Sequence, residues 1–256
     1  MSAATTWAVE LTGFAKSFST GWTGGRLNAV RGLTLQVAPG QVVGLLGPNG
    51  SGKSTTLKAL AGLLVPSAGE CRIFGCRAGS DEARALVGYL PESPQFPAHL
   101  TGRGFLEYCA GLSSLESTAT AGRVDEVLAW SGLAEAAMYR VGTYSKGMAQ
   151  RLGLAQAVLH DPPLVLLDEP ASGLDPAGRL ELSRLIRELA ARGKTVVFSS
   201  HLLTQAAELC DRLVLLGRGR SLAEGTPAEL LGATHAGHPE ATPLEKLYLE
   251  RVARDE

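Results

Sequence analysis

The sequence of 256 residues has little that would direct it to nucleic acid, into a bilayer or through a secretory pathway. Its 24 Lys and Arg are matched by 25 Asp and Glu, so there is no basic excess to neutralise nucleic-acid phosphates. The longest stretch without charge, 32–52, is broken by Pro39, Pro48 and Asn49 and by glycines, which excludes a spanning helix there. The first ten residues lack the basic and apolar segments of a secretory signal. We expect no nucleic-acid partner, no signal peptide and no transmembrane segment.

Cysteine is also scarce. The four residues Cys71, Cys76, Cys109 and Cys210 form no Cys-x-x-Cys pair and no ligand cluster with histidine. This spacing favours buried, reduced thiols, as in a cytosolic chain, over a disulfide framework or a zinc site. The hydrophobic content of 45% and the charged content of 19% are typical of a folded protein with a substantial core.

Residues 47–54 read Gly-Pro-Asn-Gly-Ser-Gly-Lys-Ser and match the phosphate-binding loop G-x-x-x-x-G-K-[ST]. They follow an apolar run, 41–46, typical of a buried strand, and precede the first turns of a helix at 54–61, which argues against a chance Gly-rich turn. In that setting backbone N–H groups bind phosphate, Lys53 adds a positive charge and Ser54 ligates Mg²⁺. The nucleotide-binding residues expected here are Gly47, Pro48, Asn49, Gly50, Ser51, Gly52, Lys53, Ser54 and Thr55.

Two carboxylates, Asp168 and Glu169, follow the apolar run 164–167. Ligands of open α/β sheets lie at the carboxyl ends of the strands, so both are candidates for chemistry. We predict that Asp168 holds Mg²⁺ and that Glu169 polarises the attacking water as a general base. The alternative is an acidic helix cap after a strand, which the phosphate-binding loop makes the weaker interpretation.

Alternating strands and helices predict an α/β fold, a P-loop NTPase core with a mainly parallel sheet. The strands expected are 8–11, 33–37, 41–46, 69–75, 164–167, 195–200 and 212–216. The first two suit an N-terminal antiparallel β subdomain, and the helical composition of 91–160 predicts an inserted α-helical subdomain at about 93–158. An amphipathic helix is expected at 178–192, and a linker with a short helix at 232–256, within a single domain, 1–256.

Three further segments make the chain resemble one family over nearly its whole length, the nucleotide-binding domains of ATP-binding cassette (ABC) transporters. Residues 144–151 resemble the family's signature, with Ser-Lys-Gly-Met in place of the commoner Ser-Gly-Gly-Gln. Residues 172–175, Ser-Gly-Leu-Asp, resemble its D-loop, and His201, after Ser199 and Ser200, resembles its switch histidine. GTPases and small-molecule kinases share the phosphate-binding loop but not the signature.

The resemblance implies an ATPase that uses ATP and Mg²⁺ and pairs head to tail with a second nucleotide-binding domain. The residues placed against the partner's ATP would be Ser145, Lys146, Gly147 and Met148 in the signature and Ser172 and Asp175 in the D-loop. Ser145 and Gly147 would donate to the γ-phosphate, and His201 would bond the γ-phosphate as the sensor of ATP versus ADP. A separate transmembrane permease would hold the dimer at the cytoplasmic face of the cell membrane, and the signature resembles that of ABC-2-type exporters.

Two positions depart from the family's pattern. Where the family has a glutamine that senses Mg²⁺ and faces the permease, this chain has Glu92, with Gln95 three residues on as a rival. Where the family stacks adenine on an aromatic ring, this chain has Phe18, with Trp22 as a competitor and plain packing as the alternative for either. We assign Glu92 to the metal site and Phe18 to the nucleotide site.

Two other functions are possible for a cassette of this kind. Soluble ABC proteins that act on ribosomes or DNA typically carry two cassettes or a long coiled-coil insertion, and the sequence shows neither. A regulatory cassette without turnover is disfavoured because Lys53, Asp168, Glu169 and His201 are all present. The sequence does not identify the transported substrate, because the permease determines which substrate is transported.

Overall fold

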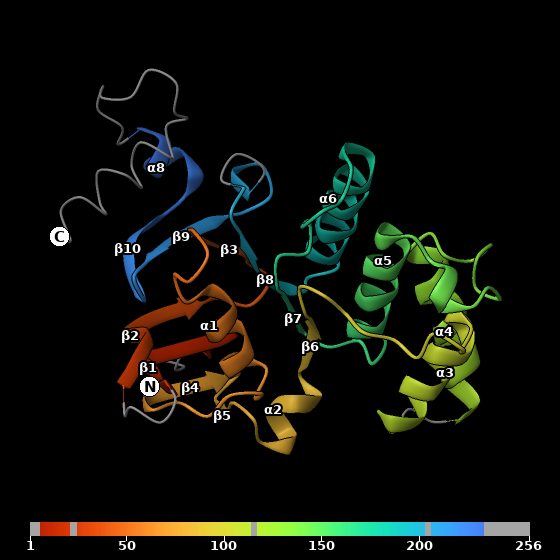
Figure 1. The fold of residues 1–256 in the computed structure, drawn as a ribbon, viewed down its shortest axis with the longest axis horizontal. Helices are drawn as coiled ribbons and strands as arrows, with labels where there is room; N and C mark the ends of the chain where they lie inside the picture. Colours follow the sequence, from red (N-terminus) through yellow and green to blue (C-terminus); the bar gives the residue numbers. More distant parts are fainter. Residues whose placement is uncertain (1–5, 21–24, 114–116, 203–205, 233–256) are drawn as a thin grey trace.

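A central sheet carries the site. The computed structural model describes residues 6–20, 25–113, 117–202 and 206–232, and Figure 1 shows two sheets with helices around them. The central sheet has the strand order β10-β9-β3-β8-β7-β6. Its strands are β3 (Val42–Leu46), β6 (Val87–Leu90), β7 (Leu164–Leu167), β8 (Thr195–Ser200), β9 (Arg212–Gly217) and β10 (Arg220–Gly225). All are parallel except β10, which is antiparallel to β9, so the mainly parallel sheet of an α/β fold is confirmed.

The second sheet is antiparallel, as expected for the N-terminal part of the chain. It has the order β2-β1-β4-β5, with β1 (Val9–Thr20), β2 (Gly25–Val37), β4 (Ala68–Ile73) and β5 (Cys76–Arg77). β1 and β2 are much longer than the expected runs 8–11 and 33–37. Cross-strand pairing explains the difference, because partners such as Phe18 and Leu27 form a ribbon that the apolar pattern alone does not reveal.

Alternate side chains of the central strands enter two different cores. Val43 and Leu45 of β3 face a core shared with the antiparallel sheet, whereas Val42 and Leu46 face a core shared with the helices. This two-residue period is that of a strand buried on both faces, typical of a parallel sheet covered on each side. The sheet is therefore held from both faces, and its strand ends are fixed.

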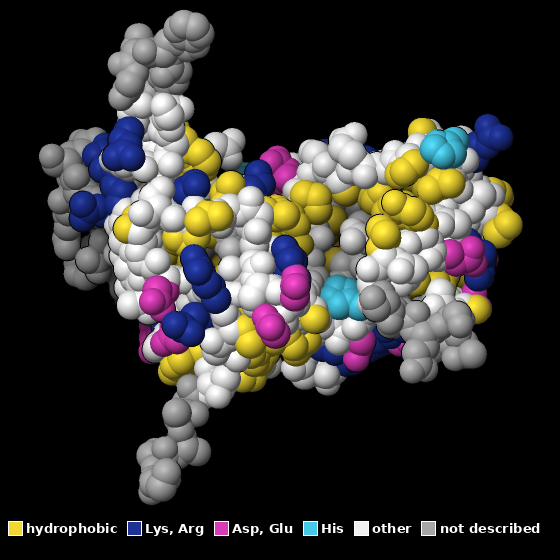
Figure 2. Space-filling model, turned by 90° about the horizontal axis from the view of Figure 1, so that it is seen from below, with side chains coloured by type: hydrophobic (Ala, Val, Ile, Leu, Met, Phe, Trp, Pro, Cys, Tyr) yellow, Lys and Arg dark blue, Asp and Glu magenta, His cyan; other side chains and the backbone are white. Residues whose placement is uncertain are grey.

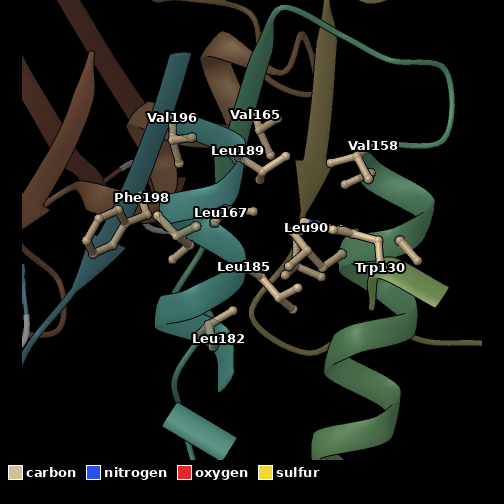
Figure 3. Close-up of a cluster of buried hydrophobic side chains, with 14 of the residues drawn as sticks. Leu90, Trp130, Val158, Val165, Leu167, Leu182, Leu185, Leu189, Val196 and Phe198 are labelled. Atoms are coloured by element: carbon tan, nitrogen blue, oxygen red, sulfur yellow. The ribbon is translucent and has the colours of Figure 1, made fainter. Parts of the chain in front are cut away.

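Helix α6 (Pro176–Ala191) covers one face of this sheet. Leu182, Leu185 and Leu189 form its buried stripe, and Figure 3 shows Leu189 beside Val165 and Leu167 of β7, with Leu185 and Leu182 in line below it. The helix expected at 178–192 is thus confirmed, but it begins two residues earlier. The reason is its N-cap, since the Asp175 carboxylate accepts a hydrogen bond of 2.8 Å from Gly178 N.

The remaining helices are mostly short. They are α1 (Lys53–Leu60), α2 (Asp81–Ala85), α3 (Gly102–Leu112), α4 (Ser117–Trp130), a 3₁₀ turn (Val141–Thr143), α5 (Lys146–Ala157) and α8 (Pro227–Gly232). In Figure 1, α3, α4 and α5 lie on the side of the central sheet away from the antiparallel sheet, within the range expected to be helical. The sequence did not anticipate α2 or α8, and the expected linker and helix at 232–256 lie outside the described residues beyond Gly232. Among the described helices, none is both long enough and apolar enough to span a bilayer.

The cysteines are free thiols, as expected. Cys71 and Cys210 are buried, and Cys76 and Cys109 are half-buried. Burial raises the pKa of the Cys71 thiol to about 12 and that of Cys109 to about 11, so both stay protonated at neutral pH.

Candidate functional site

The loop 47–52 joins β3 to α1 and depends on its glycines. Gly47, Gly50 and Gly52 have φ angles of 147°, 82° and 106°, in the region that favours glycine. A Cβ at Gly47 would collide with the carbonyl oxygen of Leu216. Gly52 caps α1 without a side-chain hydrogen bond, so the first N–H groups of this helix meet no capping side chain. The local chain is shaped to present backbone donors to an anion.

Lys53 is held beneath this loop. Its side chain is only 4% exposed, and Nζ donates to Gly47 O at 2.7 Å and to Pro48 O at 3.2 Å. Nζ also lies 3.2 Å from Oε1 of Glu169, which is itself buried. A desolvated positive charge is thus fixed between the phosphate-binding loop and the acidic end of β7.

Asp168 and Glu169 follow β7 and are both buried. Oδ1 of Asp168 accepts hydrogen bonds of 2.8 Å from Ser54 Oγ and from Ser199 Oγ. Oε2 of Glu169 lies 2.8 Å from Nδ1 of His201, which follows β8. Parallel pairing of β7 with β8 brings these strand ends together, so residues far apart in sequence meet at one edge of the sheet.

Asp168 also acts on its neighbour in β6. Burial, and after it the negative charge of Asp168, raises the pKa of the Tyr89 phenol. Tyr89 therefore stays neutral and adds no charge beside the carboxylates.

One pocket of about 520 Å³ is lined by Lys53, Glu169 and His201 together with most of the phosphate-binding loop. Its walls are Phe18, Leu27, Asn28, Ala29, Pro48, Asn49, Gly50, Ser51, Gly52, Lys53, Ser54, Thr55, Glu92, Glu169, Ser172 and His201. Gly47 and Asp168 lie behind this lining and contact it through Lys53 and Ser54. Glu92 reaches the pocket, whereas Gln95 is exposed and does not line it. Phe18 lines it with 37% of its surface exposed, and Trp22 lies outside the described residues.

The signature residues lie elsewhere. Ser145 caps α5, its Oγ accepting from Met148 N at 3.2 Å, and does not line the pocket of Lys53. A second pocket of about 540 Å³ is lined by Ser145, Lys146, Gly147, Arg151, Gly173, Leu174, Asp175, Ala177, Gly178 and Glu181. The Lys146 side chain occupies the space over Gly173, where a Cβ would collide with Nζ. The structure thus joins the signature to Asp175 of the D-loop and separates it from the phosphate-binding loop of the same chain.

Two contacts of the site were not predicted from the sequence. Ser199, fully buried in β8, bonds to both Asp168 and the backbone of Glu169, and no motif marks it beyond its place before His201. The turn between β9 and β10 supports the phosphate-binding loop, because Gly219 N donates to Ser51 O at 3.2 Å. Both contacts depend on strand neighbours that are distant in sequence.

The charged side chains on the surface are not of a single sign. On the face shown in Figure 2, acidic and basic side chains lie beside one another at several places. This distribution agrees with the net charge of −1.

Comparison with known proteins shows the family to which this chain belongs. The family model described as ABC transporter matches residues 30–172, which span the loop, the signature and the acidic pair. This chain belongs to the ABC transporter family. An uncharacterized ABC transporter ATP-binding protein of Nostoc sp. is 42% identical over 226 residues, covering 87% of this chain and 68% of that relative. The Nod factor export ATP-binding protein I of Rhizobium sp. is 39% identical over 256 residues, covering 96% and 82%.

Solved ABC cassettes have the same fold. One, described as an ATP-binding subunit of an ABC transporter, superposes with a TM-score of 0.79 at 31% identity, covering 96% of this chain and 99% of its own. Another, a dimeric cassette in a post-hydrolysis state bound to ADP and Pi, gives 0.78 at 26% identity, covering 86% and 98%. Together with the pocket, these likenesses identify this ABC chain as an ATP-binding ATPase subunit.

Proposed function

We propose that this ABC ATPase dimerises head to tail on ATP and drives a separate membrane-spanning permease. The observation that carries the proposal is the separation of two pockets in one chain. One pocket holds Lys53 and Glu169, and the other holds Ser145 and Asp175. A second copy, arranged head to tail with the first, brings the signature of each chain to the phosphate-binding loop of the other. Two complete sites form in this way. The dimeric cassette bound to ADP and Pi supports this arrangement.

The residues around Ser54 fit a magnesium ion. Mg²⁺ prefers oxygen ligands and is usually bound through one or two carboxylates together with the phosphates of its nucleotide. Ser54 Oγ and Asp168 Oδ1 are 2.8 Å apart beside the phosphate-binding loop, and Glu92 adds a carboxylate to the same pocket. Within the described residues, no group of three or more His, Cys, Asp or Glu forms a metal cage, which suits an ion that arrives with ATP. Bound there, the ion would neutralise charge on the β- and γ-phosphates.

Glu169 is placed to act on the attacking water. Its carboxylate lies between Lys53 and His201, and it opens onto the pocket in which the γ-phosphate would lie. In the proposed step Glu169 accepts the proton of the water as its oxygen attacks the γ-phosphorus, the bond from that phosphorus to the β–γ bridging oxygen breaks, and ADP and inorganic phosphate are the products. Lys53 and the backbone N–H groups of the loop stabilise the charge on the phosphate oxygens, and His201 orients Glu169 and bonds the γ-phosphate. Residues 1–256 form a single cassette in this proposal, with a helical subdomain at about 93–158.

The permease and the direction of transport rest on relatives. Several relatives carry the name Nod factor export ATP-binding protein I, which supports export as the direction for this chain. A partner in the membrane would place the cassette at the cytoplasmic face. Identifying the membrane polypeptide that co-purifies with this chain tests this part of the proposal independently of the ATPase site.

A trapped dimer tests the head-to-tail arrangement. Glu169→Gln keeps the shape of the site and removes the base, so hydrolysis should slow by about 10²–10⁴. With ATP and Mg²⁺ this variant should elute as a dimer in size-exclusion chromatography, and with ADP as a monomer. Adding Ser145→Arg should abolish the dimer and preserve nucleotide binding to the phosphate-binding loop.

Thr143→Arg is the matched control. Thr143 is exposed, lies two residues before Ser145 and does not line the second pocket, so the dimer should persist. Wild-type hydrolysis by Glu169→Gln would refute the base assignment. Failure of that variant to dimerise at high protein concentration, with ATP bound, would refute a dimer formed by the cassettes alone.

A further inference from the structure

Ser199 joins the two acidic residues of the site. It lies in β8, fully buried, opposite the point where β7 ends. Its Oγ donates to Asp168 Oδ1 at 2.8 Å and accepts from the backbone N of Glu169 at 2.7 Å. A hydroxyl has one proton, and an ionised carboxylate can only accept a hydrogen bond. The Ser199 proton must therefore point to Asp168, which leaves a lone pair of Oγ for the amide of Glu169.

The backbone of Glu169 needs such support. Its φ angle is 44°, in the left-handed region, where a residue other than glycine is strained. The hydrogen bond from its amide to Ser199 opposes relaxation of that backbone. The side chain is held separately, because His201, two residues beyond Ser199, lies 2.8 Å from Oε2. One end of β8 therefore holds Glu169 at both its backbone and its carboxylate.

We propose that Ser199 is a positioning residue for ATP hydrolysis, which sets the relative placement of Asp168 and Glu169. The proposal rests on the roles proposed above for these two carboxylates. Ser199 does not line the pocket, and within the described residues its hydroxyl bonds only to those two residues. Its removal should therefore disturb the geometry of the base and of the metal ligand, and leave the phosphate-binding loop intact.

Ser199→Ala tests this role by its kinetic signature. Loss of a residue that orients a metal ligand typically costs 10–100-fold in activity or metal affinity, so kcat should fall by about that factor. The KM for ATP should stay within about twofold, and the Mg²⁺ concentration for half-maximal activity should rise. Ser199→Thr keeps the hydroxyl on a side chain suited to a strand and should restore most of kcat.

The matched control is Ser131→Ala. Ser131 is also fully buried and its hydroxyl donates to Leu128 O at 3.2 Å, but it lies in the helical region away from the pocket. This variant should keep kcat and the Mg²⁺ dependence within about twofold of the wild type. Melting temperatures and the affinity for a non-hydrolysable ATP analogue, measured for all variants, separate a loss of catalysis from a loss of fold.

Three results would overturn the proposal. The first is wild-type kcat and Mg²⁺ dependence in Ser199→Ala. The second is a fall in kcat matched by equal losses of analogue affinity and melting temperature, which would show a general structural role. The third is a Ser199→Thr protein that binds the analogue yet stays as slow as the alanine variant. Glu169→Gln is assayed in parallel to separate the role of Glu169 from that of Ser199. Wild-type rates in Glu169→Gln would refute the assignment of Glu169 as the base, and with it the proposed function on which the role of Ser199 rests.

Discussion

Lys53 and Glu169 form a buried ion pair, with Nζ 3.2 Å from Oε1 and side-chain exposures of 4% and 8%. The pair links the phosphate-binding loop to the residue proposed as the base. Removing one partner leaves the other charge buried without compensation, which is costly in a desolvated site. Each residue therefore keeps the other in place, besides the role proposed for it toward ATP.

Lys53→Ala should weaken ATP binding. Hydrogen bonds to charged groups contribute about 1.5–3 kcal/mol, which predicts a roughly ten- to hundredfold loss of affinity. Lys58→Ala, an exposed lysine of the same helix, is the control and should bind as the wild type does. Titration with a fluorescent ATP analogue measures both, and equal affinities would contradict the assignment of Lys53.

Phe18→Ala should weaken ATP binding by about two- to twelvefold, because stacking contributes roughly 0.5–1.5 kcal/mol beyond the buried area. Phe18→Tyr keeps the ring and should bind nearly as tightly. Leu27→Ala removes apolar surface from the neighbouring strand without an aromatic ring and should have a smaller effect. The same titration on Trp22→Ala tests the competing site, and a larger loss there would transfer the role to Trp22.

Glu92→Ala should lower ATP turnover more than Gln95→Ala, because Glu92 reaches the pocket and Gln95 does not. Glu92→Gln supplies the amide usual in the family and should retain most of the turnover. Steady-state ATPase rates over a range of Mg²⁺ concentrations measure the effect. A loss of turnover in Gln95→Ala alone would transfer the role from Glu92 to Gln95.

Acidification should destabilise the fold through His160. Burial is the main cause that lowers the pKa of His160 below 6.5, Arg123 and Lys194 lower it further, and a backbone bond to Val87 and the charge of Asp161 oppose the shift. The unfolded chain therefore binds the proton more readily, so stability decreases as the pH falls from above 6.5 through the lowered pKa.

The free energy of unfolding in urea at about pH 7.5 and pH 5.5 checks this sign. The wild type should lose more stability between these values than His160→Gln, in which position 160 does not titrate. An equal loss in both proteins would assign the pH dependence to other groups.

Local patterns were enough to predict much of the site. The loop 47–54 is continuous in sequence, and its glycines and lysine lie at or just before the first turn of the helix that follows. The same holds for the stripe of α6, whose period follows from helix geometry, and for the apolar run before Asp168, which is typical of a strand buried on both faces. Such features depend on neighbours within a few residues, so the sequence alone determined them.

Only the tertiary structure decided the contacts between distant segments. Ser54 and Asp168 are 114 positions apart, and Glu169 and Ser199 are 30 apart, yet each pair is joined by a hydrogen bond because β3, β8 and β7 are adjacent in the sheet. Strand order is set by how the apolar faces of the whole chain pack, which no local pattern records. The same packing placed Glu92, and not Gln95, in the pocket and put the signature in a pocket of its own. The sequence determined which groups could act on ATP, and the packing of the sheet decided which of them meet.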